Sequence, residues 1–532
     1  MLCSLEKQNA ELKTQGNFTF YVMGKYYVTT PIYYANDKPH IGHAYTTVAA
    51  DVLARYHRLK GDETWFLTGT DEHGAKVAAA AKEAGEEPKA YVDKQAVAFK
   101  KSWHGLDISY DDFIQTTEPR HETGAQKFLK TLKDKGALYK DTYKGLYCTG
   151  CEKFMTEKEL VDGECPDHKK KPELIEEENW FFRLSDYLPK VKELIESGEL
   201  EILPEPKKNE ALGLIEQGLD DFSVSRQKVK WGIPLPFDEG QTTYVWIEAL
   251  TNYLTALDYE NDGQKFRDFW PADMQLMAKD ILKFHAIYWP AVLLASELPL
   301  PKKLFAHGFF TINGQKMSKT VGNVIDSNDL VKKFGADGTR YLLLAQFPFG
   351  IDGDIKEGKF VEKYNAELAN NLGNLVSRVL KMTHKFFDGK VPEIKKDISE
   401  LPLQNGQFIE FDEPYLWKQV TAFIEGKFEP FECLNSIWRF VNSLNVYVDK
   451  NEPWKLAKEG KQEELAEVMY DLLYSLYQLS FTLYPFLPTA ATKIKKALTG
   501  TDFTRLSERE QELPAGQKVE DIDVLFPRIE KS

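Results

Sequence analysis

Two histidines, His40 and His43, lie three residues apart after a short β-like run at 26–30. An apolar-periodic segment follows them and predicts a helix. A strand, a tight loop and a helix present backbone N–H groups and the positive end of a helix dipole to a phosphate. Pro39 suits the first turn of that helix, the two imidazoles would share one helical face, and Gly42 would let a base or a sugar approach the backbone. The stretch predicts a nucleotide site; the alternative is a pair of histidines that only satisfy hydrogen bonds at a helix start.

A second stretch, residues 310–320, is a glycine-punctuated loop that contains Lys316, Lys319 and several hydroxyl groups. Gly314 makes the loop flexible, and the lysines can meet an anionic group that moves during a reaction. Taken alone, it would be an ordinary exposed loop. Paired with the two histidines, it indicates chemistry on phosphates.

Three ionisable residues, Asp71, Glu72 and His73, follow a compact β-rich run at 64–69. In open parallel sheets, ligands bind just past the carboxyl ends of the strands. Asp71 is therefore a candidate for binding a substrate amine. The alternative is that it caps a helix at 75–84.

Cys148, Cys151, Cys165 and His168 follow the pattern Cys-x2-Cys, an intervening segment, then Cys-x2-His. Two short turns would each offer two ligands, and thiolates with an imidazole favour tetrahedral zinc. Four protein ligands leave no open position for a reacting water. The pattern predicts a structural zinc knuckle.

An aromatic stripe is a further candidate. Ile281, His285 and Trp289 recur at four-residue spacing, which lines one face of a helix, and the run at 244–250 predicts a strand leading into a helix. Such a stripe is usually core packing and becomes a pocket only if an apolar ligand is implied.

Composition limits the classes of protein. The chain has 532 residues and 42% hydrophobic content, which predicts several domains with sizeable cores. A net charge of −14 argues against general adhesion to nucleic acid or anionic membranes. The longest apolar run, at 286–295, is too short for a membrane helix, and the charged residues at 1–18 do not fit a secretion signal. With only five cysteines, a disulfide framework is not expected. We expect a cytoplasmic protein with no membrane association.

The elements that position these residues follow a changing rhythm. Strand and helix patterns alternate over 25–115 and again over 222–310, and the region between them holds the cysteine cluster. After about residue 355 only helical patterns remain, and Pro485 and Pro488 interrupt the last of them.

The two motifs at 40–43 and 316–320 together resemble the signature of class I aminoacyl-tRNA synthetases. Within that class the chain resembles methionyl-tRNA synthetase over nearly its whole length, through the stretches 30–36, 68–74, 244–246 and 279–281, the knuckle and the helical tail. The resemblance implies activation of methionine with ATP and Mg to methionyl-adenylate and pyrophosphate, followed by transfer of the methionyl group to the terminal ribose of tRNA.

The fold that this implies is α/β, a Rossmann-like doubly wound parallel sheet with an inserted zinc-knuckle domain, followed by an all-α helical bundle. The expected segments are an N-terminal extension (1–24), the first half of the catalytic domain (25–115), the inserted connective domain (116–221), the second catalytic half (222–310), the signature loop with a stem-contact segment (311–359) and an anticodon-binding bundle (360–532).

The resemblance also implies roles for single residues. His40 and His43 would hold the ATP phosphates, and Lys316 and Lys319 would close over the leaving pyrophosphate. Asp280, together with Gly42 and Lys319, would bind ATP, and Asp71 would take the methionine amine. The implied methionine pocket is Ile32, Tyr34, Asp71, Trp246, Ala249, Leu250, Tyr253, Ile281, His285 and Trp289. The implied anticodon readers are Asn374, Arg378 and Trp454, which would make initiator and elongator methionine tRNAs the partners. We expect one structural zinc ion per chain and a monomer.

Two departures and several rivals remain. Thr320 stands where serine is commoner in the motif, and there is one knuckle where some relatives have two. A synthetase for isoleucine, valine or leucine would need a large editing domain, for which 116–221 is too short. A cysteine-activating relative would hold zinc at the amino-acid pocket. A non-catalytic tRNA-binding protein or a small-molecule nucleotidyltransferase is the other class of answer.

Overall fold

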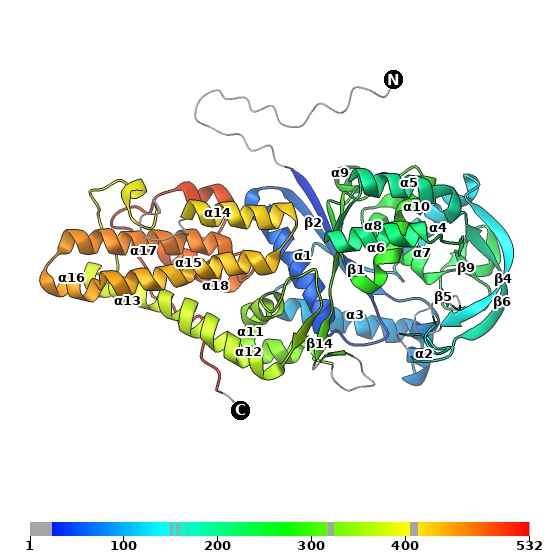
Figure 1. Ribbon diagram of the computed structural model, residues 1–532, viewed down its shortest axis with the longest axis horizontal. Coiled ribbons are helices and arrows are strands. Elements are labelled where there is room, and N and C mark those ends of the chain that lie inside the picture. Colours follow the sequence, from blue (N-terminus) through cyan, green and yellow to red (C-terminus); the bar gives the residue numbers. More distant parts are fainter. Residues whose placement is uncertain are drawn as a thin grey trace, which may run out of the picture.

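The computed structural model describes residues 24–148, 153–155, 157, 160–166, 169–312, 314–317, 324–404 and 413–530. The molecule is elongated, with a helical bundle at one end and an α/β domain at the other (Figure 1). Within these residues, no helix combines the length and the apolar character needed to cross a membrane.

A six-stranded parallel sheet forms the centre of the α/β domain, in the order β3-β2-β1-β12-β13-β7. Its strands are β1 (Lys25–Tyr34), β2 (Glu63–Asp71), β3 (Asp112–Gln115), β7 (Glu201–Leu203), β12 (Met274–Ala278) and β13 (Lys303–His307). The chain leaves β1 towards β2 and leaves β12 towards β13, so the strand order reverses between β1 and β12. In this class of sheet the ligand crevice lies at such a point, past the carboxyl ends of the strands.

Helices cover both faces of this sheet and bury separate apolar cores. On one face lie α1 (Ile41–Lys60), α3 (Pro88–Gly105) and α11 (Ser327–Leu344); on the other lie α4 (Pro119–Asp134), α7 (Val245–Leu250), α8 (Asn252–Thr255) and α10 (Trp289–Ala295). The remaining helices of this half are α2 (Ala75–Glu83) and α9 (Gln264–Phe269). The prediction of a doubly wound α/β fold is confirmed.

The segment between the two halves of the α/β domain adds an antiparallel sheet, in which β4 (Leu138–Cys148) pairs with β6 (Glu173–Phe182) along most of its length. β5 (Lys153–Met155) and β8 (Phe222–Ser223) flank them. Helices α5 (Leu184–Ser197) and α6 (Glu205–Glu216) lead back, and β7 between them joins the central sheet rather than the insertion. A smaller sheet holds β9 (Ser225–Arg226), β10 (Pro234–Leu235) and β11 (Asp238–Thr243).

The last part of the chain passes through a short sheet into the bundle. The sheet is β14 (Phe310–Ile312), β15 (Gln315–Lys316) and β16 (Gly353–Ile355). The helical part comprises α12 (Glu357–Lys363), a π-helical segment η5 (Tyr364–Gly373), α13 (Asn374–Phe387), α14 (Glu413–Thr421), η7 (Ala422–Gly426), α15 (Pro430–Asn451), α16 (Pro453–Glu459), α17 (Gln462–Leu483) and α18 (Pro488–Thr499). As predicted, α17 stops before Pro485 and α18 begins at Pro488, because proline fits only the first turn of a helix.

A buried ion pair joins the bundle to the α/β domain. Arg340 on α11 and Asp51 on α1 are both completely buried, with Nη1 2.6 Å from the carboxylate. The same guanidinium donates from Nε to the carbonyl of Phe486 and from Nη2 to that of Pro485, both at 2.8 Å. The turn between α17 and α18 is thereby held against the helix that begins at the signature histidines.

Candidate active site

The two signature histidines cap helix α1. The Nδ1 of His40 accepts from the N–H of Gly42 at 3.1 Å, and the Nδ1 of His43 accepts from the N–H of His40 at 3.3 Å. The imidazoles stack with centroids 3.8 Å apart. The helix therefore begins at Ile41, and the prediction that Pro39 lies in its first turn is wrong: proline precedes the capping residue.

This capping arrangement fixes the tautomer of both rings. Because each Nδ1 accepts a backbone hydrogen bond, each neutral imidazole carries its proton on Nε2. Burial lowers the pKa of His40 to about 4, and burial, with the neighbouring His40 and Lys76, lowers that of His43 well below its usual value. At neutral pH the pair offers two N–H donors rather than general bases.

Gly42 has a packing role that its sequence position did not show. A Cβ at this position would come within 2.9 Å of Cε1 of His40. A glycine is therefore needed for the stacked rings to sit over the helix start. The same atom would be 3.6 Å from Cε of Met317, so the second signature stretch lies directly beside the first.

The second signature stretch begins as a hairpin. β14 and β15 pair across Gly314, which has φ +75°, and the backbone of Lys316 belongs to β15. Beyond this stretch, the N–H of Ile41 in the first motif donates to the carbonyl of Ile325 at 3.1 Å. Lys319 lies outside the described residues.

The strand ends hold the two predicted acidic residues. Asp71 is the last residue of β2 and is 4% exposed. Helix α2 begins at Ala75 after Gly74, so the alternative that Asp71 caps this helix is wrong. Asp280 lies in a short 3-10 turn after β12 and is exposed. Both positions adjoin the β1–β12 switch point.

An aromatic cluster lies beside them. Trp246 lies edge-on to Tyr34 at 5.9 Å and stacks on Phe284 at 3.9 Å between centroids. The hydroxyl of Tyr253 lies 2.8 Å from Nε2 of His285, whose Nδ1 faces the carbonyl of Ile281 at 3.1 Å. The structure gathers most of the predicted pocket residues in one apolar cluster: Ile32, Tyr34, Trp246, Leu250, Tyr253, Ile281 and Trp289. Ala249 and His285 are buried as well.

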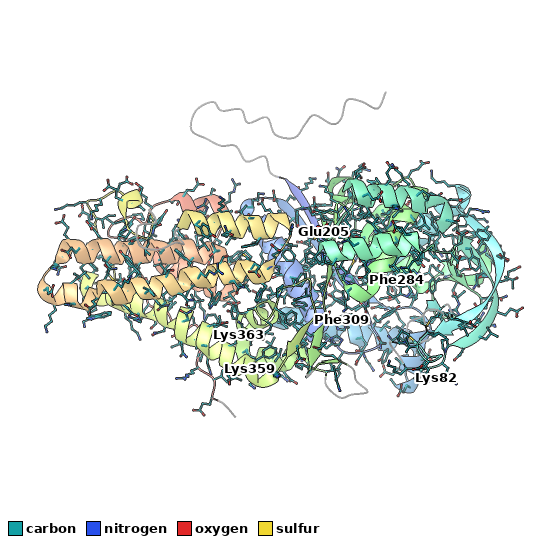
Figure 2. The ribbon with its side chains drawn as sticks, in the orientation of Figure 1. Lys82, Glu205, Phe284, Phe309, Lys359 and Lys363 are labelled. Atoms are coloured by element: carbon teal, nitrogen blue, oxygen red, sulfur yellow. The ribbon has the colours of Figure 1, made fainter. Side chains whose placement is uncertain are left out.

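Local structure here differs from the simple helical pattern. Residues 244–250 contain no strand; β11 ends at Thr243 and α7 begins at Val245. The four-residue spacing of Ile281, His285 and Trp289 runs through a π-helical segment, Phe284–Tyr288. Sequence reasoning missed Phe284, which Figure 2 labels in the α/β half, because a residue one position from the stripe would face elsewhere in a regular α-helix.

Other buried ionic groups also went unpredicted. Arg226 on β9 pairs with Glu177 on β6 at 3.1 Å and lies over the ring of Tyr147 at 4.2 Å. No local pattern signals a pair that far apart in the chain. Glu248, His73 and His121 form a second such cluster, in which the carboxylate lies between the two imidazoles.

The predicted anticodon readers lie in the bundle. Asn374 and Arg378 are on α13, and Trp454 is on α16, at the end of the molecule farthest from the sheet (Figure 1). The guanidinium of Arg378 lies 5.9 Å from the Trp454 ring and 2.8 Å from Asp449. Trp454 is 44% exposed, so its ring is open to a ligand.

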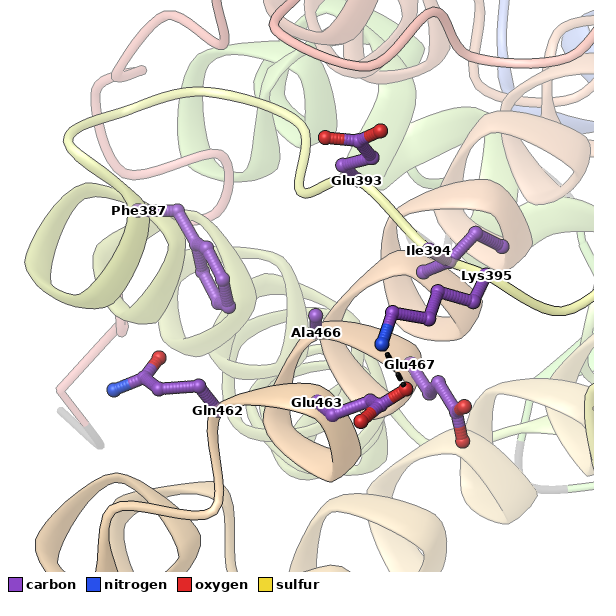
Figure 3. A pocket seen from close by; sticks show the side chains of 8 residues that line it. All are labelled: Phe387, Glu393, Ile394, Lys395, Gln462, Glu463, Ala466 and Glu467. Atoms are coloured by element: carbon purple, nitrogen blue, oxygen red, sulfur yellow. Dashed lines mark ion pairs between the residues drawn. The ribbon is translucent and has the colours of Figure 1, made fainter.

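The bundle also has a hollow of about 290 Å³ between Phe387 and the start of α17 (Figure 3). Lys395 and Glu463 form an ion pair of 3.0 Å at its edge. None of the predicted site residues lines it.

The cysteine pattern is partly described. Cys148 and Cys165 are buried in one small cluster with Met155. Cys151 and His168 lie outside the described residues. Among the residues that the structure does describe, no group of three or more side chains is arranged to hold a metal ion.

Comparison with known proteins settles the family. Residues 26–171 and 167–380 match the model of class I tRNA synthetases of the methionine type, and 430–532 match the anticodon-binding domain of methionyl tRNA ligase. The methionine–tRNA ligase of Caldanaerobacter subterraneus is 45% identical over 95% of this chain and 79% of its own length. The chain belongs to the methionyl-tRNA synthetase family.

Other members of the family also match over nearly the whole chain. The methionine–tRNA ligase of Clostridium perfringens is 46% identical over 95% of this chain and 78% of its own length. The Mycobacterium tuberculosis methionyl-tRNA synthetase in complex with methionyl-adenylate has a TM-score of 0.90 at 36% identity and covers 95% of this chain and 100% of that one. As a member of this family, the chain is an ATP-dependent aminoacyl-tRNA ligase for methionine, and the rival assignments fall away.

Proposed function

We propose that the strand-end site forms methionyl-adenylate and that individual side chains have the roles set out below. A carboxylate oxygen of methionine attacks the α-phosphorus of ATP, the bond to the β-phosphate oxygen breaks, and pyrophosphate leaves with the electron pair. The carboxylate is already a nucleophile, so the protein's task is to position the reactants and to neutralise charge.

The observation that carries this proposal is the stacked pair His40 and His43. Their Nδ1 atoms are used by the helix cap, so two Nε2–H groups are left at the positive end of α1. Neutral donors fixed before the substrate arrives can stabilise charge as it builds on the phosphates without reorganising. Lys316 and Lys319 add positive charge over the leaving pyrophosphate.

ATP and methionine are oriented by the strand ends. Asp280 after β12 binds the ATP ribose, and Gly42 lets the nucleotide approach the start of α1. Asp71 is buried at the end of β2, where a carboxylate gains most from a bound ammonium group. The thioether of methionine lies against Trp246 and the Tyr253–His285 pair, because aromatic edges suit a polarisable sulfur.

Recognition of tRNA is assigned to the bundle. Trp454 stacks on an unpaired anticodon base, and Asn374 and Arg378 read base edges. Initiator and elongator methionine tRNAs share this anticodon face as partners. A monomeric, cytoplasmic enzyme stays a prediction.

Two metal ions complete the proposal. Zinc is held by Cys148, Cys151, Cys165 and His168, and the fit rests on the shared burial of Cys148 and Cys165, the donor type that zinc prefers. Its chemistry is structural, since the knuckle lies in the insertion. Magnesium accompanies ATP as the substrate's counter-ion. Metal analysis of the purified protein should give about one zinc per chain.

ATP–pyrophosphate exchange tests the function directly. We expect exchange with methionine and none with isoleucine, valine or leucine. His43→Ala should reduce the exchange rate about 100-fold or more, because it removes one preorganised donor. His104→Ala, at an exposed position on α3, is the matched control and should leave exchange unchanged. Normal exchange in His43→Ala would refute the assigned role.

A further inference from the structure

A buried charged cluster lies next to the proposed methionine pocket. The carboxylate of Glu248 lies 3.1 Å through Oε1 from Nδ1 of His73 and 2.8 Å through Oε2 from Nε2 of His121. On its other side, Nδ1 of His121 lies 2.9 Å from Oγ1 of Thr255. The exposed fractions of Glu248, His73 and His121 are 1%, 3% and 0%, so water does not stabilise the charge.

The cluster joins three segments that are far apart in the chain. His73 lies two residues after Asp71 at the end of β2. Glu248 lies on α7 between Trp246 and Ala249, two proposed pocket residues. His121 lies on α4, the first helix after β3.

Several hydrogen bonds hold the backbone at the end of β2, next to His73. The N–H of Glu72 donates to Thr116 at 2.9 Å, its carboxylate accepts from Thr70 at 2.7 Å, and its carbonyl accepts from Nε1 of Trp231 at 2.6 Å. The N–H of Gly74 donates to the carbonyl of Trp231 at 3.0 Å. His73 is thus a fixed point against which α7 can be placed.

Helix α7 needs such a fixed point. It has six residues, too few for a helix to be stable without tertiary contacts. Glu248 is the only charged residue in it. Its two carboxylate oxygens are engaged on different elements and the side chain is only 1% exposed, so we assign it no direct contact with a substrate. Glu248 can act only through the position of its neighbours.

Electrostatics strengthens the connection. Burial opposes the charged form of Glu248, but His73 and His121 more than offset it and hold the pKa of Glu248 below its usual value. Burial likewise opposes protonation of His73, yet Glu248, with Glu122 and Glu72, raises its pKa. A buried carboxylate that loses such partners is strongly destabilised, so the arrangement is held in one geometry.

We propose that Glu248, bridging His73 and His121, is a positioning residue that holds the pocket wall on α7 in register with Asp71 on β2. It sets the affinity for the amino acid rather than the rate of chemistry. This inference rests on the proposed role of the pocket. The side chain of the substrate and its amine are then held by two elements whose spacing this cluster fixes.

The test is Glu248→Gln, which keeps the shape but removes the charge and one acceptor. We expect the KM for methionine in ATP–pyrophosphate exchange to rise about tenfold or more, with kcat and the KM for ATP within about twofold of the wild type. Glu122→Gln is the matched control, because Oε1 of Glu122 lies 3.9 Å from the same His73 and the side chain is 43% exposed. It should change no constant more than about twofold.

A second pair of variants keeps the test decisive if Glu248→Gln unfolds. His121→Gln places an amide nitrogen near the position of Nε2 and should retain most of the affinity for methionine; His121→Leu removes the donor and should lose it. Equal changes in the KM for ATP and methionine, or a fall in kcat alone, would overturn the proposal. Failure of the wild type to exchange with methionine would instead overturn the proposed function.

Discussion

The proposed methionine pocket and the proposed anticodon face use aromatic residues in opposite ways. In the pocket, Tyr253 and Trp289 are at most 1% exposed and rest in the core of the α/β domain. On the face, Trp454 is 44% exposed and has the Arg378 guanidinium 5.9 Å from its ring. A flexible thioether is distinguished by removing it from water into a shaped cavity, whereas a base in an RNA loop can be stacked on an open ring.

The comparison also accounts for the net charge of −14. A protein that recognises RNA by general attraction needs a basic surface, but an exposed tryptophan with a nearby guanidinium needs only a local site. The negative charges elsewhere then limit binding of other RNA.

Two arginines, Arg340 where the bundle meets the α/β domain and Arg378 on the anticodon face, should give the largest contrast in stability. Arg340→Met should lower the free energy of unfolding by about 3–5 kcal/mol, because the carbonyls of Phe486 and Pro485 lose a buried charged donor and Asp51 loses one of its two arginine partners, keeping Arg55. Arg378→Met should lower it by less than about 1 kcal/mol, since Asp449 is 65% exposed. Urea unfolding followed by circular dichroism measures both. Equal losses of stability in the two variants would contradict the difference between the buried ion pair of Arg340 and the exposed anticodon face.

Truncation inside the pocket should give the next largest effect. His285→Ala leaves a cavity and removes the partner of the Tyr253 hydroxyl. The value of kcat/KM for methionine should therefore fall roughly 30- to 1,000-fold, which corresponds to about 2–4 kcal/mol of lost transition-state stabilisation. His384→Ala, at an exposed site on α13, is the control. Methionine-dependent exchange decides the matter, and a change below threefold would remove His285 from the pocket.

Truncation on the face should be milder and should separate the two steps. Trp454→Ala should reduce kcat/KM for tRNA charging by the equivalent of about 1–3 kcal/mol, which is the usual free-energy contribution of stacking on one base. Methionine-dependent pyrophosphate exchange should not change, because that step does not use tRNA. Equal loss in both assays would show that Trp454 is structural.

Acidification should give the smallest effect on stability, with opposite signs in the α/β domain and in the bundle. Burial lowers the pKa of His285 and of His307 to about 4, so their unfolded forms bind more protons below pH 6.5 and the α/β domain loses stability as pH falls. Burial raises the pKa of Asp471 on α17 to about 6, so its folded form binds more protons and the bundle gains stability as pH falls through 6.

From pH 7 to pH 5.5 each group should contribute about 1 kcal/mol. Hydrogen exchange read by mass spectrometry, corrected for the intrinsic rate, resolves the two regions. Asp471→Asn should abolish the gain in the bundle and leave the α/β response intact. Losses of the same sign in both regions of the wild type would contradict the comparison.

Much of the fold could be predicted because local patterns determine it. The run 64–69 is a strand and Pro485 and Pro488 separate two helices, since β-rich composition and the missing N–H of proline act within a few residues. The two signature motifs were also found in the sequence, from their residue types and from their joint resemblance to a known family. Their residues lie at a helix start and a hairpin, where short stretches of backbone set the geometry.

The tertiary structure decided what depends on distant partners. The short strand β7 joins the central sheet because its neighbour β13 offers a free edge, which no pattern near residue 201 reveals. Glu248 meets His73 across 175 positions of sequence, and Arg340 meets Phe486 across 146. Sequence determined which groups could do chemistry, because side-chain type sets charge and donors. Tertiary packing alone decided which of them are buried together. Burial sets the free-energy cost of leaving a charge unpaired, and therefore how firmly a buried charge holds its partners in place.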